Sequence, residues 1–556
     1  MSSEYKDPMN SIPNSNERKP SPVQPLLFAL TLIAGMFIGT NLGDKNLLQV
    51  KPSIEQNANK LVSLIDFIED NYVDSINKQQ LIDDAIASVL KNLDPHSYYM
   101  AADEVALEKE RMKGEFSGVG IEFLILRDSL MVVKTIAGGP SEKAGVQSGD
   151  RIVMVDGAPI SGKELDSEKA QKLLKGKQGS QVRVTIMRPG ERQTKEFTIE
   201  RGSIPIESVN ASFMVNDTVG YVRIDRFAEK TYDEFIEAAE LLKDNGCKSL
   251  ILDLRGNGGG LLNQAAEIVE EFLTEGRTIV RTRGIHTGED EIRSGKKGKY
   301  RDVNVIVMID QNSASASEIV AGALQDWDRS VTVGRRSFGK GLVQHEMELA
   351  DNSALRLTVA RYYTPTGRCI QKPYGDSINY EDDFHRRLEK GELTSADSVQ
   401  FPDSLLFRTP AGRLVYGGGG IMPDVFVPLD SIYFSGLLSE IAYSGIIRDF
   451  CFTYLDSHRK EMRKYKSADE FIDKFSVSDA MLSSLIDLAE KDEIKINKQV
   501  IKKITPQLKS RVKGQFARSL FDETAMIRVS LESDPDFKKA LQVALEYKQH
   551  ASVRKP

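Results

Sequence analysis

Apolar residues recur every three to four positions between Ile54 and Leu93, a spacing that predicts two amphipathic helices. The break between these helices falls near Asp74–Ser75, and Pro95 prevents the second helix from continuing. A charged helix is expected over Asp103–Lys113. We therefore expect residues 44–113 to form a helical N-terminal region.

The residues before these helices divide into a polar part and an apolar part. Residues 1–24 are polar and contain four prolines, which predicts a disordered leader. Residues 25–43 carry no charge and can span a bilayer, which takes about twenty residues. Three basic residues precede the apolar run, whereas Asp44 and Lys45 after it cancel, so the leader is predicted to be cytoplasmic. In a Gram-negative cell this places a single-pass anchor in the inner membrane and the remaining chain in the periplasm.

Two other interpretations of the apolar run compete with the anchor. A cleaved signal peptide would need a small-residue cleavage site, and no A-x-A site follows the run. A buried core helix is the other alternative. The uncleaved anchor is favoured over both.

The pattern changes at Gly114 to short alternating runs separated by Gly, Pro and Asp, typical of a small β-rich module over residues 114–202. Its one convincing helix is Ser167–Leu174. Strands are expected at Ile121–Leu126, Leu130–Ile136, Arg151–Val155, Gln181–Met187 and Glu196–Glu200.

Strands and helices alternate from Thr218 onward, which predicts a central, largely parallel sheet covered by helices, within a core over residues 203–430. The expected strands are Val219–Ile224, Ser249–Leu254, Thr278–Thr282, Val303–Ile309 and Val331–Gly334, with helices at Tyr232–Asp244, Leu261–Leu273 and Ala316–Asp326. Two further strands are expected at Gly341–Met347 and Leu355–Tyr363, and residues 376–402 form a charged excursion. The pattern of residues 431–556 predicts a helical C-terminal extension. The fold class is α/β with several domains.

Composition excludes several classes of function. The chain of 556 residues is too long for one compact core, and its net charge of −7 gives no support to nucleic-acid binding. Its three cysteines are too few for a disulfide framework, and its six histidines form no close ligand pair. No metal site or nucleic-acid partner is therefore expected, and the serine chemistry considered below needs no cofactor.

Candidate chemistry lies beyond the carboxyl ends of the core strands, where ligands of open α/β sheets collect. Ser313, Ser315 and Ser317 open the expected helix after strand Val303–Ile309. A serine there could attack an acyl carbon while neighbouring N–H groups hold the oxyanion. Alternatively, one of the three merely caps the helix, with Glu318 completing a capping box. The residue types alone do not decide between the three serines.

A base for such a serine is offered by Lys340, which lies in a glycine turn after a buried strand. Lysine acts as a base only when neutral, which requires desolvation to lower its pKa. The alternative is an ordinary solvated lysine. Gln344 follows in an extended segment, on the face of Lys340 by strand period, and could orient the amine without adding charge.

The loop 253–260 follows another expected strand and is rich in glycine. It lacks both GxGxxG and a GK[ST] ending, so a nucleotide site is not indicated. An exposed glycine N–H in this loop could supply a second oxyanion donor.

The segments around Ser315 and Lys340 resemble those of a known family. The segment Asn312–Asp326, followed by Phe338-Gly339-Lys340-Gly341-x-Val343-Gln344, resembles the carboxy-terminal processing (tail-specific) peptidases of the S41 class. Lys340 lies 25 residues after Ser315, and Gln344 four residues after Lys340, as in that family. The resemblance implies a crotonase/Clp-like α/β protease core with Ser315, Lys340 and Gln344 as the catalytic set. It extends over about residues 54–430, through Leu93-Asp94-Pro95-His96-Ser97, a PDZ-like module, Thr364-Pro365-x-Gly367 and Gly419–Asp424.

The resemblance also implies further site residues. The N–H groups of Ala316 and of one glycine in Gly258–Gly260, taken here as Gly259, would form the oxyanion hole. Gly118-Val119-Gly120-Ile121 resembles a PDZ loop that binds a terminal carboxylate, which selects proteins by their C-termini. Lys175 stands where many members have arginine, so the sequence does not say whether the PDZ module activates or inhibits.

The resulting prediction is a membrane-anchored periplasmic serine endopeptidase that recognises C-terminal tails and cleaves through a Ser–Lys dyad. The alternative is a catalytically silent PDZ scaffold that gathers envelope proteins by their C-termini. Partners are then proteins or peptides with accessible C-termini and the inner membrane. An adaptor and a second copy, each bound through residues 431–556, are further alternatives that the sequence leaves open.

Overall fold

The computed structural model describes residues 52–126, 129–160, 165–375, 379–380, 382–399, 401–430, 432 and 435–547. The chain divides into two compact units, residues 1–88 and 89–556. The first contains α2 (Pro52–Asn71) and most of α3 (Lys78–Lys91), which confirms the two expected amphipathic helices. The predicted leader and anchor lie outside the described residues. Within the described ranges, no helix is both long and apolar enough to cross a membrane.

The β-rich module is present in the second unit. Its antiparallel sheet has the order β3-β4-β5-β7-β8, with β6 (Ala158–Pro159) paired to β5. These strands are β3 (Ile121–Leu126), β4 (Ser129–Thr135), β5 (Arg151–Val155), β7 (Gln181–Met187) and β8 (Lys195–Glu200). The helices are α5 (Pro140–Ala144) and the expected α6 (Ser167–Leu174). A separate pair, β2 (Glu115–Gly118) and β9 (Gly202–Pro205), brings the two ends of the module together.

The central sheet of the core has six strands in the order β10-β11-β12-β15-β16-β21. All neighbours from β11 to β21 are parallel, and β10 is antiparallel, so the expected largely parallel sheet is confirmed. The strands are β10 (Val209–Met214), β11 (Val219–Ile224), β12 (Ser249–Asp253), β15 (Asn304–Ile309), β16 (Ser330–Gly334) and β21 (Val425–Phe426).

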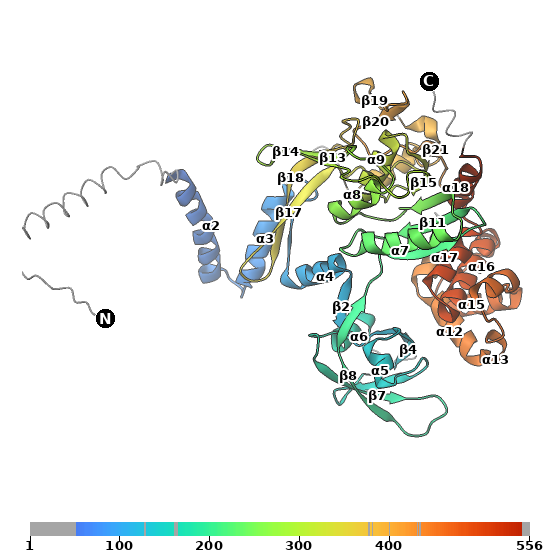
Figure 1. The fold of residues 1–556 in the computed structure, drawn as a ribbon. Coiled ribbons are helices and arrows are strands. Elements are labelled where there is room, and N and C mark those ends of the chain that lie inside the picture. The colour runs from blue at the N-terminus through green and yellow to red at the C-terminus, as the bar shows by residue number, and fades with distance from the viewer. Residues whose placement is uncertain are drawn as a thin grey trace, which may run out of the picture. The chain divides into compact units, whose positions relative to one another are not determined.

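Helices cover both faces of this sheet (Figure 1). Alternate strand residues such as Leu252 and Val307 pack against α7 (Thr231–Asp244), α8 (Leu262–Glu270) and α9 (Ala316–Asp326). The residues between them, such as Ile251 and Ile306, pack against α17 (Glu523–Leu531) and α18 (Pro535–Leu545). Because strand side chains alternate between faces, continuous apolar runs are expected where both faces are buried. The C-terminal helices thus complete the core, and packing crosses the boundary expected at residue 430.

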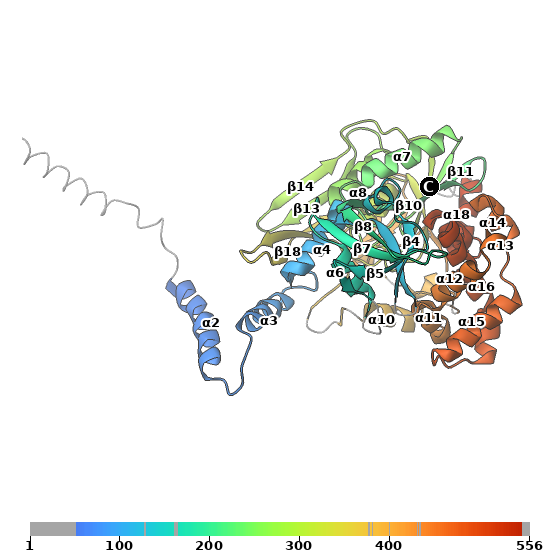
Figure 2. The same ribbon diagram turned by 90° about the horizontal axis from the view of Figure 1, so that it is seen from below.

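The other C-terminal helices form a hydrophobic core of their own, and Figure 2 shows them gathered together. They are α11 (Gly436–Tyr443), α12 (Ile446–Ser457), α13 (Arg459–Met462), α14 (Ala468–Lys474), α15 (Asp479–Lys491) and α16 (Lys498–Leu520). The helical pattern expected after residue 430 is therefore present.

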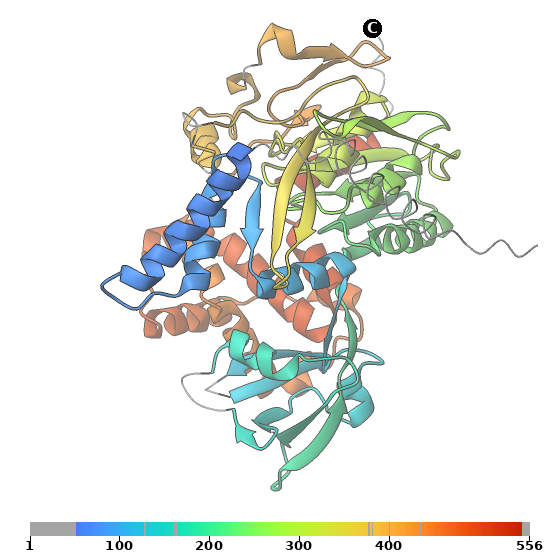
Figure 3. The same cartoon turned by 90° about the vertical axis from the view of Figure 1, so that its left-hand side faces the viewer.

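The second sheet of the core is antiparallel. Its strands are β1 (Tyr98–Met100), β13 (Thr278–Gly284), β14 (Gly288–Arg293), β17 (Leu342–Glu348) and β18 (Ala354–Tyr363). Figure 3 shows the short β1, in blue, along the yellow β17–β18 hairpin, where Tyr99 pairs with Leu355. The expected placement of Thr278–Thr282 in the parallel sheet is wrong, because this strand pairs with β14 and β18 instead.

Three smaller features complete the second unit. The charged helix expected over Asp103–Lys113 is α4 (Ala102–Lys113). The excursion after residue 376 contains α10 (Asp383–Glu389), and β19 (Leu406–Arg408) pairs with β20 (Leu414–Tyr416).

Candidate active site

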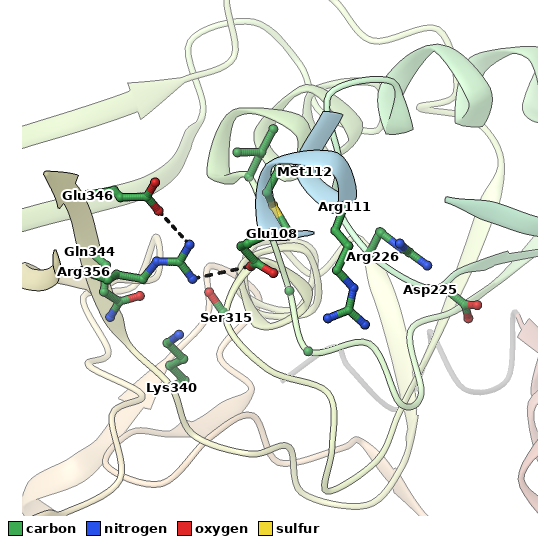
Figure 4. A pocket seen from close by; sticks show the side chains of 14 residues that line it. Glu108, Arg111, Met112, Asp225, Arg226, Ser315, Lys340, Gln344, Glu346 and Arg356 are labelled. Atoms are coloured by element: carbon green, nitrogen blue, oxygen red, sulfur yellow. Dashed lines mark hydrogen bonds and ion pairs between the residues drawn. The ribbon is translucent and has the colours of Figure 1, made fainter. Parts of the chain in front are cut away.

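A cavity of about 530 Å³ brings Ser315, Lys340 and Gln344 together (Figure 4). The three residues come from the start of α9, from the turn before β17 and from β17 itself. The glycine loop, residues 258–260, forms another part of the wall. The structure therefore collects around one space the residues that the sequence had placed in three separate loops.

Ser315 lies at the entry to α9 with a φ of +55°, which is rare for a residue with a side chain. Such a conformation costs about 1–3 kcal/mol and persists only where the surroundings enforce it. Gly259 leaves room for this turn, because a Cβ on Gly259 would lie 2.7 Å from the Ser315 Cβ. The position after β15 thus presents a serine at a strained turn that faces the cavity.

The two neighbouring serines are engaged elsewhere. The buried Ser313 hydroxyl donates to the Leu254 carbonyl at 2.8 Å, and the buried Ser317 hydroxyl donates to the Asn257 carbonyl at 2.9 Å. Both bonds fix the start of α9 to the glycine loop. Among the three candidates, the structure gives Ser315 alone a place in the cavity wall.

The structure leaves the oxyanion role of Ala316 a prediction and corrects the assignment of Gly259. The Ala316 N–H belongs to the first turn of α9, where amides have no acceptor one turn earlier. The Gly259 N–H, in contrast, donates to the Asn257 side-chain oxygen at 2.8 Å, so it does not point to a substrate. Gly258 and Gly260 line the same cavity, and their N–H groups have no protein acceptor within the described segments. One of them is the better candidate for the second donor.

Lys340 is partly buried in the wall next to Ser315, as Figure 4 shows. Burial lowers the pKa of its amine, and the positive charge of Arg356 lowers that pKa further. The Tyr362 hydroxyl donates to the carbonyl oxygens of Lys340 (2.6 Å) and Ser315 (3.1 Å), and so ties the two backbones together. The environment has the features that a lysine base requires.

Glu318 joins the turn that carries Ser315 to the turn that carries Lys340. Its carboxylate accepts the N–H groups of Ser315 (2.9 Å), Gly339 (2.8 Å) and Lys340 (2.9 Å), and the Ser337 hydroxyl (2.5 Å). The side chain is fully buried, and burial raises the pKa of its carboxyl to about 7. The sequence had assigned it only a capping role.

Gln344 is held from the neighbouring strand. It lies directly across from Thr358 in the β17–β18 ladder, and its Nε2 donates to the Thr358 hydroxyl at 3.5 Å. That hydroxyl donates to the Asp94 carboxylate at 3.0 Å. The expectation that Lys340 and Gln344 share a strand face is wrong, because Lys340 precedes β17 and a bulge follows Val343.

Sequence reasoning missed the part of the wall that α4 supplies. Glu108, Arg111 and Met112 from this helix line the cavity, and so does Arg356 from β18. Arg356 lies 2.9 Å from Glu346 and 3.5 Å from Glu108. The helix α4 is distant in the sequence from the serine, lysine and glycine loops. Its charged residues form no pattern that predicts a contact with those loops.

Comparisons with known proteins show the family of the chain. The profile of peptidase family S41 matches residues 218–379. The chain is 38% identical to a carboxy-terminal-processing protease of Bartonella bacilliformis, over 61% of this chain and 79% of that protein. It is 32% identical to the carboxy-terminal processing protease CtpB of Bacillus subtilis, over 61% of this chain and 72% of that protein.

The chain belongs to peptidase family S41. Profiles for a PDZ domain and for the N-terminal domain of the activating protease CtpB match residues 117–199 and 34–104 of this S41 peptidase. A family of unknown function matches residues 437–522. Among solved structures, a photosystem II D1 C-terminal processing protease is similar, with 27% identity, a TM-score of 0.33, and coverage of 64% of this chain and 84% of that one.

In the PDZ domain of this S41 peptidase, the glycine loop precedes β3, which pairs with β4 alone among the strands that the structure describes. Gly118 ends β2, Gly120 has a φ of +73°, and Ile121 begins β3. The Val119 carbonyl accepts the N–H and the hydroxyl of Ser141, at 3.0 and 2.6 Å. Because β3 is the outermost strand of its sheet, an extended peptide could pair with it. The role of Gly118, Val119, Gly120 and Ile121 in holding a carboxylate stays a prediction.

Lys175 connects the PDZ domain to the cavity wall. Its amine lies 2.6 Å from the Glu110 carboxylate on α4 and 4.7 Å from the centre of the Phe116 ring. The same helix carries Glu108 and Arg111 into the cavity. The S41 peptidase thus has a direct contact between the end of α6 and a helix of the active site.

Proposed function

We propose that this S41 peptidase is a serine-type endopeptidase that cleaves proteins selected by their C-terminal tails, with Ser315 as nucleophile and Lys340 as general base. The observation that carries the proposal is the convergence of these two residues and Gln344 on one cavity. The burial that lowers the Lys340 pKa supports the role of base, since only the neutral amine can accept a proton.

In the first step, the neutral Lys340 amine takes the proton of the Ser315 hydroxyl while the serine oxygen attacks the scissile carbonyl carbon. The carbonyl oxygen then becomes an oxyanion. The Ala316 N–H and a second N–H from Gly258 or Gly260 stabilise that charge, at about 3–4 kcal/mol for each donor. Gln344 orients the amine without adding a charge.

In the second step, the Lys340 ammonium returns the proton to the leaving amine, the C–N bond breaks, and an ester to Ser315 remains. Water then attacks this ester with Lys340 again as base. The new carboxylate is released, and the serine and the neutral lysine are restored.

Selection of the substrate is assigned to the PDZ domain. The loop of residues 118–121 would hold a terminal carboxylate while the tail pairs with the free edge of β3. Binding the tail raises the concentration of the scissile segment near the cavity. The relatives are named for carboxy-terminal processing, which supports the same substrate class.

The proposed location is the periplasmic side of the inner membrane, with residues 25–43 as an uncleaved single-pass anchor. Support comes from the length of the uncharged segment and from the basic residues before it. Membrane fractionation of the full chain and of a variant without residues 25–43 tests this. We expect the full chain in the membrane fraction and the variant outside it. Equal distribution of the two proteins would contradict the anchor.

The catalytic proposal is tested with the full chain, Ser315→Ala and Lys340→Met. The matched control is Lys297→Met, which changes an exposed lysine outside the cavity. An unstructured protein with an apolar tail is followed by mass spectrometry, with its C-terminus either free or amidated. We expect cleavage by the parent and the control, none by the two site variants, and slower cleavage of the amidated substrate.

Equal cleavage by all four proteins would place the chemistry outside this site. Tail binding without cleavage by the parent would favour the alternative, a PDZ scaffold without catalytic activity. Equal rates for the free and amidated substrates would contradict the proposed recognition of the carboxylate but not the proposed Ser–Lys dyad.

A further inference from the structure

Two arginines enter the active-site cavity without a counter-charge. Arg111 from α4 and Arg226 from the loop after β11 both line the cavity, and Figure 4 shows both on the side away from Lys340. Within the described ranges, neither guanidinium has a hydrogen-bond or ion-pair partner. The ion pairs drawn in Figure 4 belong to Arg356 alone.

Both arginines stand on backbone that is fixed to the catalytic loops. The Phe227 N–H, next to Arg226, donates to the Gly259 carbonyl at 3.0 Å, and the Leu261 N–H donates to the Phe227 carbonyl at 2.7 Å. The Glu229 N–H donates to the carbonyl of Met112, next to Arg111, at 2.8 Å. The two arginine backbones are therefore tied to each other and to the glycine loop.

The carboxylates of the cavity are already committed to other cations. Glu108 and Glu346 both pair with Arg356. Asp225 accepts from Arg223 at 3.1 Å and from the Asn210 amide at 2.6 Å. Arg111 and Arg226 are therefore the arginines of the wall for which the described residues offer no ion pair.

We propose that Arg111 and Arg226 form a subsite for a substrate carboxylate beside the scissile bond. Guanidinium groups bind carboxylates through paired, charge-assisted hydrogen bonds, and a bound carboxylate would relieve the repulsion between the two cations. The inference rests on the proposed peptidase function and adds a substrate class to it, namely segments with an acidic group next to the cleavage point. The carboxylate comes either from an Asp or Glu side chain or from the chain end itself.

The test uses the full chain and decapeptides that carry a fluorophore and a quencher. A single Glu is moved through each position on either side of the scissile bond, and each Glu peptide is paired with its Gln counterpart, all with amidated ends. A further Gln series carries a free C-terminus, which separates the chain end from the side chain as the source of the carboxylate. The variants are Arg111→Gln, Arg226→Gln and the double variant, with the exposed PDZ residue Arg192→Gln as matched control.

We expect the Glu peptide to be preferred over the Gln peptide at one or two positions, by about fivefold to tenfold in kcat/KM and mostly through KM. The ratio of kcat/KM for the Glu peptide to that for the Gln peptide should fall as salt is added. It should approach one in the double variant and stay at the parent's value in Arg192→Gln. If instead only the free C-terminus raises the rate, and the double variant abolishes that gain, the chain end is the source.

Binding to Ser315→Ala separates this inference from the catalytic proposal. Anisotropy with the same Glu and Gln pairs reports the subsite whether or not the parent cleaves, so absent cleavage contradicts the catalytic proposal alone. Equal affinity and equal kcat/KM for Glu and Gln peptides at every position would overturn the subsite. A Glu preference that survives in the double variant would overturn it as well.

Discussion

Asp94 and Thr358 lie 264 residues apart in the chain and share a hydrogen bond of 3.0 Å. Asp94 also accepts the Ser97 hydroxyl at 2.6 Å, and Thr358 accepts the Gln344 amide at 3.5 Å. Since Asp94 and Ser97 are largely buried, this chain of bonds is fixed at one end and reaches the cavity at the other. The amide nitrogen of Gln344 is thereby directed to Thr358, which leaves its oxygen to face the cavity.

The first prediction concerns this positioning. Thr358→Val should lower kcat by about tenfold with little change in KM, because one hydrogen bond that orients Gln344 is lost. Thr358→Ser keeps the hydroxyl and should restore most of the rate. Steady-state kinetics with a peptide substrate measures both.

A cycle with Gln344→Ala separates positioning from general damage. If Thr358 acts through Gln344, adding Thr358→Val to Gln344→Ala should cost almost nothing further. Additive losses in kcat would show that Thr358 acts by another route.

The second prediction concerns the pH dependence that Arg356 imposes. Burial is the main cause of the lowered Lys340 pKa, and the charge of Arg356 is the next. Arg356→Gln removes that charge and frees Glu108 and Glu346, so the Lys340 pKa should rise. The neutral base would then form only at higher pH, and the rising limb of kcat/KM should move to higher pH. Arg356→Lys, which keeps the charge, should move it much less, and identical profiles for parent and Arg356→Gln would contradict the argument.

The sequence alone predicts the start of α9, from its run of small residues after a buried strand. It does not choose between the three serines there. The choice of Ser315 together with Lys340 and Gln344 comes from the resemblance to peptidase family S41, whose spacing these residues match, and the structure brings the three to one cavity. The engagement of the Gly259 N–H could not be predicted, since it depends on the rotamer of Asn257. The positions of the α4 side chains in the cavity wall could not be predicted either, because they depend on packing between segments that are distant in the sequence.

The strand Thr278–Gly284, which was assigned to the wrong sheet, shows a similar limit of sequence-based prediction for the fold. Thr278–Gly284 begins with buried residues, as the central strands do, but none of the residues in its second half is buried and Arg283 is exposed. A strand that reaches solvent is typical of an antiparallel sheet with one solvated face, whereas parallel strands are buried on both faces. The order of strands along the chain favoured the wrong sheet, and the charged Arg281 and Arg283 were the available sign of the right one.

The third prediction concerns Glu318. Burial raises its pKa to about 7, above the ordinary value of 4.5 that the unfolded chain would have. Between these values the folded state holds a proton that the unfolded state releases, so stability falls as pH rises. The free energy of unfolding of the parent should therefore drop by about 3 kcal/mol relative to Glu318→Gln between pH 4.5 and 7. Urea unfolding across this range measures it, and parallel curves for the two proteins would contradict a raised pKa.

The last prediction concerns the C-terminal helix α18 and the glycine loop. Asp536, in the first turn of α18, lies 2.7 Å from Arg335, and both side chains are almost fully buried. Arg255, at the start of the glycine loop, pairs with Asp534 at 2.7 Å and with Asp253 at 2.7 Å. The C-terminal extension thus holds two segments that border the active site, one after β12 and one after β16.

Asp536→Asn should leave Arg335 buried without its counter-charge, at a cost of about 3–5 kcal/mol in unfolding free energy. Asp534→Asn acts on the more exposed partner of Arg255 and should cost less in stability while lowering kcat, because the glycine loop loses one of its supports. Thermal melts and kcat for both variants, beside the exposed control Asp473→Asn, provide the comparison. An unchanged melting temperature in Asp536→Asn, or an unchanged kcat in Asp534→Asn, would show that α18 covers the sheet without holding the loop.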